Sequence, residues 1–307
     1  MPKECIMERE KGKKRLFTLF YFLSEVGGVT VVFENAVEIM RAASVVKNGL
    51  SVAPFLACRE AARRCGISAR EAEIAALRAG LCPSRYERSV GTVGLEGQAR
   101  LLESCAAVAG CGGLGGWIIE ILARAGVGKL ILIDGDAFDE NNLNRQLYAT
   151  EENLGEPKAE AAARRAKAVN SAVETEARAV FLDAGNCAEI LSGADVVMDA
   201  LDNNGARQCA LDCCRAMGIP FVHGAVSGFC GETAVLRAGD VAPWELCGAS
   251  DRGAETEEGT APFIPPFIAA AQAAAAIKIL ARAGETPEKT MLWFDLERCA
   301  MQRLKLR

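Results

Sequence analysis

Apolar runs of strand length alternate with helical stretches along most of the chain. Residues 105–110 (CAAVAG) and 129–134 (KLILID) are two such runs, and residues 114–125 between them have helical spacing. The same rules predict two more strands and three more helices, over 194–201, 219–223, 95–104, 157–169 and 205–217. Strands that are apolar along their whole length are typical of a parallel sheet covered on both faces. The pattern therefore predicts an α/β fold with a Rossmann-like, doubly wound and mostly parallel sheet.

The first part of the chain has a different pattern, in which helical periodicity is not accompanied by long strand-like runs. Ser68 and Glu71 have the spacing of a capping box, in which each side chain binds the backbone amide of the other residue, and they predict a helix over 68–79. We therefore expect two parts, a small helical N-terminal extension over 1–80 and the α/β domain over 81–307.

Two apolar segments resemble export or membrane signals. Residues 11–15 (KGKKR) precede the run 16–23 (LFTLFYFL), an order that imitates a signal peptide, but no clear small-residue cleavage site follows. A run of about 8 residues is too short to cross a bilayer, which needs about 20. The Ala-rich stretch 267–283 is interrupted by Gln272 and Lys278, which favours a buried core helix. We expect no membrane partner.

Charge and cysteine content narrow the class of protein further. The chain has 35 Lys and Arg against 40 Asp and Glu, a net charge of -5, so it has no global basic field to hold nucleic acid by its phosphates. We therefore expect no nucleic-acid partner. The 13 cysteines are odd in number and show no regular spacing, which fits a reducing compartment better than a disulfide framework. We expect a cytoplasmic protein.

A glycine-rich turn lies between the first apolar strand and the helix that follows it. Gly110, Gly112 and Gly115 form G-x-G-x-x-G, and Gly113 lies within the same turn. Glycines at a strand-to-helix turn let the backbone approach phosphate, and the helix N-terminus supplies free N–H groups. Asp134 ends the second strand, where an acid can hydrogen-bond a ribose hydroxyl. Together these features predict a nucleotide site; the alternative is close helix packing without a ligand.

Four further motifs carry a resemblance to a known family. They are the runs 134–146 (DGDAFDENNLNRQ), 155–158 (GEPK), 201–203 (LDN) and 85–88 (RYER). In this combination the chain resembles the ThiF/MoeB/HesA family of ATP-using activating enzymes, over roughly residues 85–307. The resemblance implies that the glycine turn holds the phosphates of ATP.

The resemblance also assigns the charged groups around those phosphates. Arg145 and Lys158 match the cations on the phosphates, and Asp202 matches the acid associated with Mg²⁺ near the reacting phosphate. Attack of a carboxylate on the α-phosphorus of ATP builds charge on the phosphoryl oxygens, so cations and backbone donors must converge there. Asp202 also follows a predicted strand directly, where doubly wound folds bind ligands, although it could equally cap the next helix.

The remaining matches to the family concern the pocket for the nucleoside and the contact between subunits. Asp134 matches the ribose-binding acid, Asp136 lies beside it, and Asn142 matches a polar contact in the nucleotide pocket. Arg88 matches an arginine that crosses from a partner subunit, which implies a homodimer.

The activity that the resemblance implies is adenylation of a carboxylate. The family's usual substrate is the C-terminal Gly-Gly of a small ubiquitin-like sulfur-carrier protein. Two alternatives remain open. An NAD- or FAD-binding oxidoreductase would use the same glycine fingerprint but would leave Arg145, Lys158 and Asp202 without a role. A non-catalytic nucleotide-binding scaffold would keep the fold and lose turnover.

Departures from the family pattern concern metal and sulfur chemistry. Many relatives hold a structural zinc with two C-x-x-C pairs, and this sequence contains no C-x-x-C, so we expect ATP and Mg²⁺ but no zinc. Cys247 is the nearest candidate for a covalent nucleophile. It precedes an acidic, Gly-rich segment, 251–259, that we predict to be a mobile loop and that would raise the pKa of a thiol. His223 is the only histidine, and without a G-x-S-x-G elbow we interpret it as a satisfied, partly buried residue.

Overall fold

The structure is a computed structural model that describes the residues 27–247, 258–287 and 289–306. The chain divides into two compact units, Met1–Glu103 and Ser104–Arg307. The signal-like run 16–23 and almost all of the predicted loop 251–259 lie outside the described residues.

The first unit is mainly helical. Its helices and short strands are α2 (Gly27–Ala42), β1 (Val45–Lys47), β2 (Leu50–Ala53), α3 (Phe55–Cys65), α4 (Ala69–Arg78), β3 (Cys82–Pro83), η1 (Ser84–Tyr86) and α5 (Val90–Glu103). The predicted capping box is present, because the Ser68 hydroxyl accepts from the Glu71 amide and the Glu71 carboxylate accepts from the Ser68 amide. The small sheet was not predicted: β1 pairs antiparallel with β2, and β2 pairs parallel with β3.

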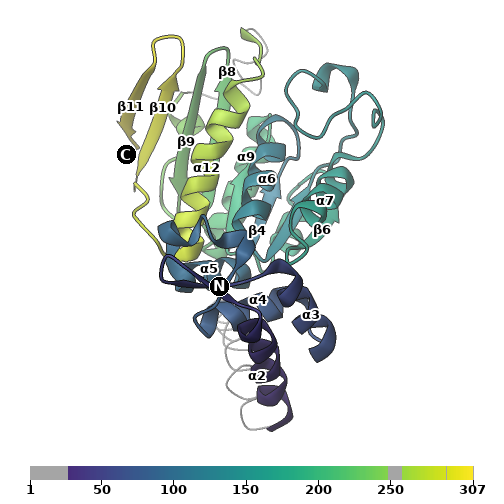
Figure 1. The fold of residues 1–307 in the computed structure, drawn as a ribbon. Helices are drawn as coiled ribbons and strands as arrows, with labels where there is room; N and C mark the ends of the chain where they lie inside the picture. Colours follow the sequence, from purple (N-terminus) through teal and green to yellow (C-terminus); the bar gives the residue numbers. More distant parts are fainter. Residues whose placement is uncertain (1–26, 248–257, 288, 307) are drawn as a thin grey trace. The chain divides into compact units, whose positions relative to one another are not determined.

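The second unit is built on one eight-stranded sheet with helices between its strands (Figure 1). Its strands are β4 (Cys105–Ala109), β5 (Lys129–Ile133), β6 (Glu174–Arg178), β7 (Val196–Asp199), β8 (Phe221–Ser227), β9 (Cys230–Leu236), β10 (Thr290–Asp295) and β11 (Ala300–Lys305). Its helices are α6 (Gly113–Ala125), η2 (Glu140–Asn142), α7 (Lys158–Val169), α8 (Cys187–Ile190), α9 (Asn204–Met217), α10 (Pro243–Cys247) and α12 (Ile264–Ala281).

The sheet has the strand order β11-β10-β9-β8-β7-β4-β5-β6. Strands β4 to β8 pair in parallel, whereas the pairs β8·β9, β9·β10 and β10·β11 are antiparallel. The prediction of a doubly wound, mostly parallel sheet is therefore confirmed. The four strands β6, β9, β10 and β11 were not predicted.

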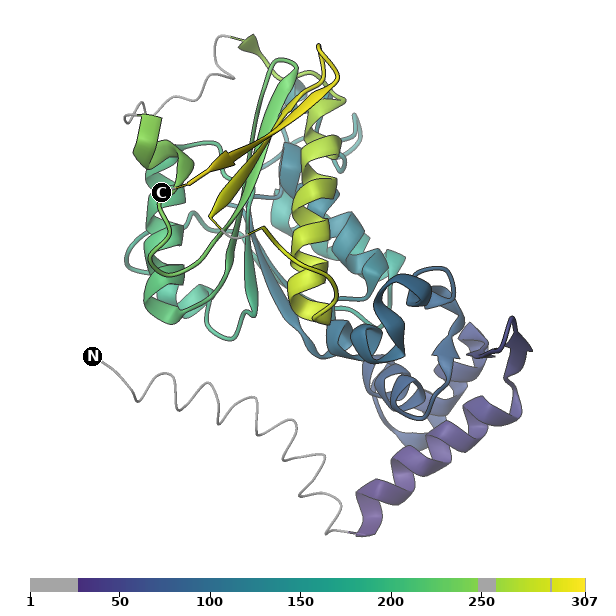
Figure 2. The same cartoon turned by 90° about the vertical axis from the view of Figure 1, so that its left-hand side faces the viewer.

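Helices cover both faces of this sheet, as the all-apolar strands require. Helices α6, α7 and α12 lie on one face, and α9 and α10 lie on the other (Figure 2). On the α9 side, Ala107, Ile131 and Val197 from three neighbouring strands share one buried cluster with Leu211 and Cys214 of α9. Because side chains of these strands are buried in both directions, the sheet forms the centre of the core.

Helix α12 is the predicted Ala-rich core helix. Among the described residues it is the one helix long and apolar enough to cross a membrane, and half of that stretch is buried inside the protein. It packs close to the sheet: a Cβ on Gly224 of β8 would lie 2.3 Å from Cδ of Gln272, and one on Gly231 of β9 would lie 2.4 Å from Cγ1 of Ile268. These contacts make α12 a structural helix of the α/β unit.

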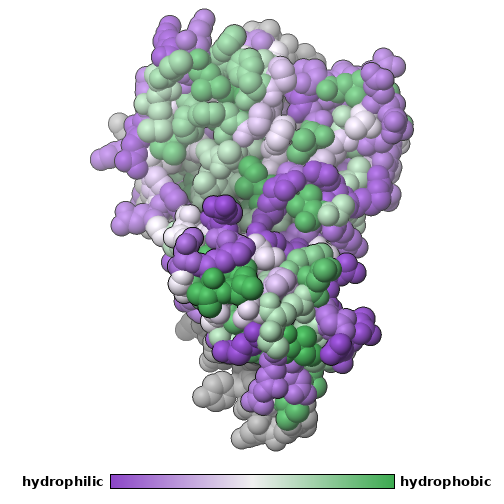
Figure 3. Space-filling view, in the orientation of Figure 1, coloured by the Kyte–Doolittle hydropathy of each residue, from purple (hydrophilic) through white to green (hydrophobic). Residues whose placement is uncertain are grey.

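The outer side of α12 and the adjacent strands keeps apolar side chains at the surface. Figure 3 shows apolar residues gathered over the part of the second unit where Figure 1 labels α12 and β10. Phe267 packs edge-on against Phe294 at 5.2 Å between ring centroids, and Phe263 packs against Phe229 at 5.2 Å. The rings of this group thus contact each other while remaining partly exposed.

Candidate nucleotide-binding site

The glycine turn after β4 has the conformation that its sequence predicts. Gly110 has φ +95°, a left-handed value that side chains disfavour, and a Cβ there would lie 2.3 Å from the carbonyl oxygen of Ala200. A Cβ on Gly115 would lie 1.9 Å from the carbonyl oxygen of Gly110. Glycine is therefore required at both positions, at one for the turn and at the other for close packing of α6 against it.

This turn presents the N-terminus of α6. The first helical hydrogen bond runs from the Gly116 amide to the Gly112 carbonyl at 3.0 Å, so the amides of residues 112–115 have no helical acceptor. Unpaired amides at a helix N-terminus, together with the helix dipole, favour an anion. Cγ of Arg145 lies 3.9 Å from where a Gly113 Cβ would be, which brings an arginine to the same helix end.

Asp134, directly after β5, is bonded to the glycine turn. Its carboxylate accepts from the Cys111 amide at 2.7 Å and from the Asp136 amide at 2.8 Å. Burial raises the pKa of Asp134, and these two amide hydrogen bonds and the charge of Lys158 oppose the rise. The carboxylate therefore joins the ends of β4 and β5. Its role toward a ribose stays a prediction.

Lys158 is a buried cation at the first position of α7. Its side chain is only 8% exposed, and its Nζ lies 3.2 Å from Oδ2 of the half-exposed Asp136. A buried ammonium needs a compensating charge, which Asp136 supplies here. The two predicted residues are thus brought together, and an incoming phosphate would compete with Asp136 for the ammonium.

Helix η2 and the turn after it carry three polar residues of the predicted motif. Arg145 donates from Nη1 to the Asn141 carbonyl at 2.7 Å and to Oδ1 of Asn144 at 2.8 Å. Asn142 is buried and accepts from the Asp139 amide at 3.1 Å, so its side chain stabilises the turn itself. Gln146, which we did not single out in the sequence, is buried against Gly112 and its Oε1 has no hydrogen-bond partner. An unpaired buried oxygen at this turn is a polar group available to a ligand.

Asp202 lies three residues beyond β7, in the turn that leads into α9. The residue that caps α9 is Asn203, whose Oδ1 accepts from the Ala206 amide at 2.8 Å. The alternative that Asp202 caps this helix is therefore wrong, because the chain reaches the helix one residue later. Asp202 is exposed, and its Oδ1 accepts a 3.2 Å hydrogen bond from Nδ2 of Asn203. Its carboxylate remains accessible to a cation.

The upstream arginine motif lies in the first unit. Arg85 and Tyr86 both bind the buried Glu73, at 3.1 Å in each case. Burial raises the pKa of Glu73, and the Arg85 charge and the Tyr86 hydroxyl oppose the rise. Arg88 lies in the following turn and is exposed. Two residues of the motif, Arg85 and Tyr86, are therefore structural, and Arg88 is an arginine at the surface.

Two further residues with reactive side chains, His223 and Cys111, are buried. His223 contacts carboxylates with both ring nitrogens, which agrees with our interpretation that its hydrogen-bonding groups are paired. It is only 1% exposed, so it is fully buried rather than partly buried. Cys111 is buried in the glycine turn, and burial raises the pKa of its thiol far above the usual range. Cys247 ends α10, and its side chain lies outside the described residues.

The site as a whole occupies the carboxyl ends of three parallel strands. Gly110 follows β4, Asp134 follows β5 and Asp202 follows β7, at the edge where doubly wound sheets bind ligands. Free helix amides, an arginine and a buried lysine face the same end. Fold and site together define a nucleotide-binding protein of the doubly wound α/β class that is built to hold phosphates.

Comparison with known proteins names the family. The profile of the ThiF family matches residues 86–307, and the chain belongs to this family. Similar proteins include the SAMP-activating enzyme E1 of Haloferax volcanii, 37% identical over 69% of this chain and 80% of that protein. The sulfur carrier protein adenylyltransferase of Thermus thermophilus is 35% identical over 73% of this chain and 87% of that protein.

Two further similarities extend the comparison. The chain is 34% identical to the adenylyltransferase and sulfurtransferase MOCS3 of Arabidopsis thaliana over 74% of its own length, but it spans only 51% of that relative. Among solved structures, Escherichia coli MccB with ATP aligns over 81% of this chain and 82% of that chain with a TM-score of 0.66 at 18% identity. That likeness supports the fold.

Proposed function

We propose that this chain is an ATP-dependent adenylyltransferase that activates the C-terminal Gly-Gly carboxylate of a small ubiquitin-like sulfur-carrier protein as an acyl-adenylate. Its ThiF-family relatives are named as adenylyltransferases and activating enzymes. The observation that carries the proposal is the convergence of Arg145, Lys158 and the α6 amides at one end of the sheet. An NAD- or FAD-dependent oxidoreductase would use the α6 amides for its pyrophosphate but would leave Arg145 and Lys158 without a role.

ATP, when bound, supplies an electrophilic α-phosphorus and a pyrophosphate leaving group. The free amides of residues 112–115 are donors that fit such a polyanion, whereas the unpaired Oε1 of Gln146 is an acceptor that fits a donor group of a ligand. Arg145 offers a planar fork that can grip two phosphate oxygens, whereas Lys158 offers a compact point charge. These cations would stabilise the charge that develops when the carrier's carboxylate oxygen bonds to phosphorus and the bond to pyrophosphate breaks.

We propose that Asp202 holds Mg²⁺ that arrives with the nucleotide. Magnesium in nucleotide sites takes one or two carboxylates in addition to phosphate oxygens. Asp202 is exposed, and Asn203 rather than Asp202 is used to cap α9, which supports this role. No structural zinc is part of the proposal, since the sequence lacks C-x-x-C pairs.

We propose a homodimer in which Arg88 acts in the site of the second subunit, and a cytoplasmic location. The dimer rests on the family resemblance of the RYER motif and on the exposed position of Arg88. The location is supported by the cysteines whose side chains the structure describes, which are free thiols.

ATP–pyrophosphate exchange tests the proposed reaction. Purified protein with Mg²⁺ should exchange labelled pyrophosphate into ATP only when a carrier ending in Gly-Gly is present. Asp202→Asn and Arg145→Ala should each lower the exchange rate by about 100-fold, because each removes a group that faces the developing charge. Glu189→Gln and Arg237→Ala make matched changes at exposed residues elsewhere in the second unit and should leave the rate unchanged.

The outcomes separate the remaining alternatives. ATP binding without exchange, for any carrier offered, would favour a non-catalytic scaffold. Exchange that survives both Asp202→Asn and Arg145→Ala would contradict the residue roles while leaving the reaction intact. Failure to bind ATP would overturn the proposal.

A further inference from the structure

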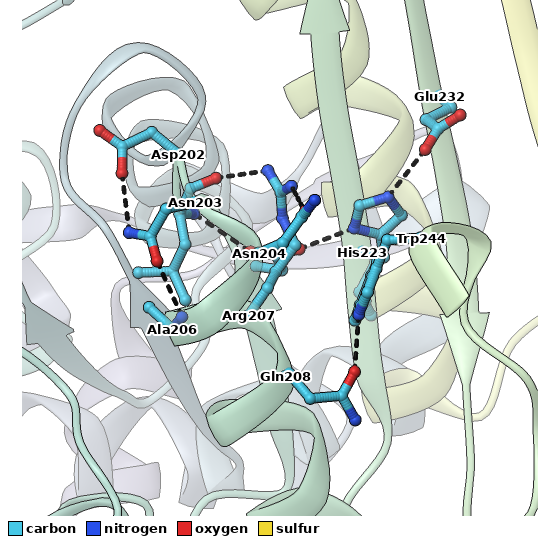
Figure 4. Close-up of polar contacts among 12 residues, drawn as sticks. Asp202, Asn203, Asn204, Ala206, Arg207, Gln208, His223, Glu232 and Trp244 are labelled. Atoms are coloured by element: carbon cyan, nitrogen blue, oxygen red, sulfur yellow. Dashed lines mark hydrogen bonds and ion pairs between the residues drawn. The ribbon is translucent and has the colours of Figure 1, made fainter. Parts of the chain in front are cut away.

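A buried ionic network lies beneath the turn that carries Asp202. His223, on β8, has its Nδ1 2.7 Å from Oδ2 of Asp199 and its Nε2 3.1 Å from Oε1 of Glu232 (Figure 4). His223 and Asp199 are 1% and 0% exposed, and Glu232 is 18% exposed in its side chain. The imidazole is therefore held between two carboxylates, from the strands on either side of it.

This arrangement favours the charged form of the histidine. A neutral imidazole has one N–H and can donate to only one of the two carboxylates, whereas the cation donates to both. Burial lowers the pKa of His223, but the hydrogen bonds to Asp199 and Glu232 and the charge of Asp199 outweigh it and raise the pKa above the usual value. The imidazolium form is the one that satisfies every group in contact with the ring.

Asp199 connects the histidine to the site. Its Oδ2 also accepts from Nε of Arg207 at 3.0 Å, and its Oδ1 accepts from the Leu201 amide at 3.1 Å. Arg207 in turn donates from Nη2 to the Leu201 carbonyl at 2.5 Å and from Nη1 to Oδ1 of Asn204 at 3.0 Å. Both backbone polar groups of Leu201, the residue before Asp202, are thus bonded to this network.

His223 is surrounded by charged residues from three neighbouring elements and by uncharged side chains from two helices. The charged neighbours in the described structure are Asp199 of β7, Glu232 of β9 and Arg207 of α9, so two carboxylates face two cations. From α10, the ring of Trp244 packs edge-on at 4.9 Å. From α12, Gln272 contributes an uncharged donor to the Asp199 carbonyl at 2.7 Å.

We propose that His223, as a cation between Asp199 and Glu232, is a positioning residue that fixes the Leu201 turn and thereby the carboxylate of Asp202. The proposal rests on the function proposed above. It predicts that losing the His223 charge lowers the rate of adenylation, because Asp202 loses its fixed position, while ATP still binds at the glycine turn. His223 does not touch the reacting groups.

The single histidine of the chain makes a direct test practical. Isotope-labelled histidine gives one imidazole signal in a nuclear magnetic resonance titration, so the pKa of His223 is read without assignment of overlapping residues. Glu232→Gln keeps an acceptor for Nε2 but removes its charge, and should lower that pKa by about 1 unit. Glu189→Gln, the same change at an exposed site of α8, should leave it unmoved.

The rate of ATP–pyrophosphate exchange is then followed against pH. A group whose pKa is raised by folding gives its contribution below that pKa and loses it as pH rises through it. The alkaline fall of kcat should therefore follow the titration of His223 and move to lower pH in Glu232→Gln by the same amount, with KM for ATP unchanged. His223→Gln should lower kcat by about 10-fold and remove that limb of the profile.

Hydrogen exchange of the Leu201 amide supplies a readout that does not need turnover. This amide should exchange faster in His223→Gln than in the wild type, since Asp199 loses one of its two cationic partners and keeps only Arg207. A titration that moves in Glu232→Gln while the kcat profile stays in place would overturn the positioning role. A wild type with no pyrophosphate exchange would overturn the proposed function alone, and unchanged amide protection would then overturn this inference independently.

Discussion

Gly115 is the position where the site tolerates the least change. Its missing side chain lets α6 approach the Gly110 carbonyl, from which a Cβ would be 1.9 Å away. We expect Gly115→Ala to lower the free energy of unfolding by about 3 kcal/mol or more and to abolish ATP binding, because the contacted atom is backbone and cannot move aside. Thermal unfolding with and without ATP measures both effects.

Gly116 provides the matched control one residue further along α6. A Cβ there would meet Cβ of Leu147 at 3.4 Å, an ordinary contact. Gly116→Ala should keep ATP binding and gain about 0.5 to 1 kcal/mol from helix propensity. If the two changes lowered the free energy of unfolding and ATP binding equally, the cause would be the packing of α6 in general rather than its contact with Gly110.

Asn203 and Asp202 are adjacent residues with different expected roles. Asn203→Ala removes the cap of α9 and should lower the free energy of unfolding by about 1 kcal/mol. Asp202→Asn leaves the cap in place, so it should change stability little while lowering pyrophosphate exchange. Chemical denaturation and exchange rates on the same samples separate the two effects, and a large loss of stability in Asp202→Asn would contradict the assignment.

The candidate site residues could be found in the sequence where they follow apolar strands directly. Gly110 and Asp134 are of this kind, because the end of a buried strand fixes the place of the next residue. The pairing of His223 with Asp199 was not predictable, since it joins positions 24 residues apart across two strands. The true cap, Asn203, differs from the alternative by one residue, which is below the precision of helix boundaries in a sequence.

At the scale of elements, the approach of α12 to the sheet depends on glycines in β8 and β9. A Cβ on Gly231 would lie 2.4 Å from Cγ1 of Ile268. We expect Gly231→Ala to lower the free energy of unfolding by about 2 kcal/mol through overpacking. Ile268→Ala removes the contacted atom and costs about 3 kcal/mol by itself.

The double variant decides whether the two residues are coupled. Because Ile268→Ala provides the space that the new methyl group needs, the double variant should be more stable than the sum of the single losses by about 1 kcal/mol or more. Chemical denaturation of the four proteins measures this coupling. Simple additivity would mean that α12 shifts away from β9 instead.

Two of the missed strands, β6 and β11, differ from the predicted strands in burial. Strands β4, β5 and β7 are central and almost wholly buried, so their apolar runs are visible in the sequence. Strand β6 (ETEAR) lies at one edge with no buried residue, and all six residues of β11 at the other edge are exposed. An edge strand that buries little carries no strong apolar pattern, and only its pairing to a neighbour reveals it.

At the scale of the whole molecule, the proposed homodimer predicts that two inactive variants recover activity when they are combined, which a monomer would not do. Arg88→Ala and Asp202→Asn should each inactivate the protein. If Arg88 completes the site of the second subunit, co-expression of the two variants forms mixed dimers in which one site has both residues. With random pairing, about a quarter of the sites are intact, so about a quarter of the wild-type exchange rate should return. No recovery, with mixed dimers shown to be present, would mean that Arg88 acts within its own chain.

The order of the strands also has a consequence for how the chain is made. Strand β4 lies at the centre of the sheet between β5 and β7, and the Cys105 amide is bonded to Asp195, 90 residues later. A ribosome that adds about 5 to 20 residues per second takes roughly 5 to 20 s to supply the second neighbour of β4. During that time one edge of an apolar strand has no partner, so the nascent chain is most exposed to aggregation before β7 emerges.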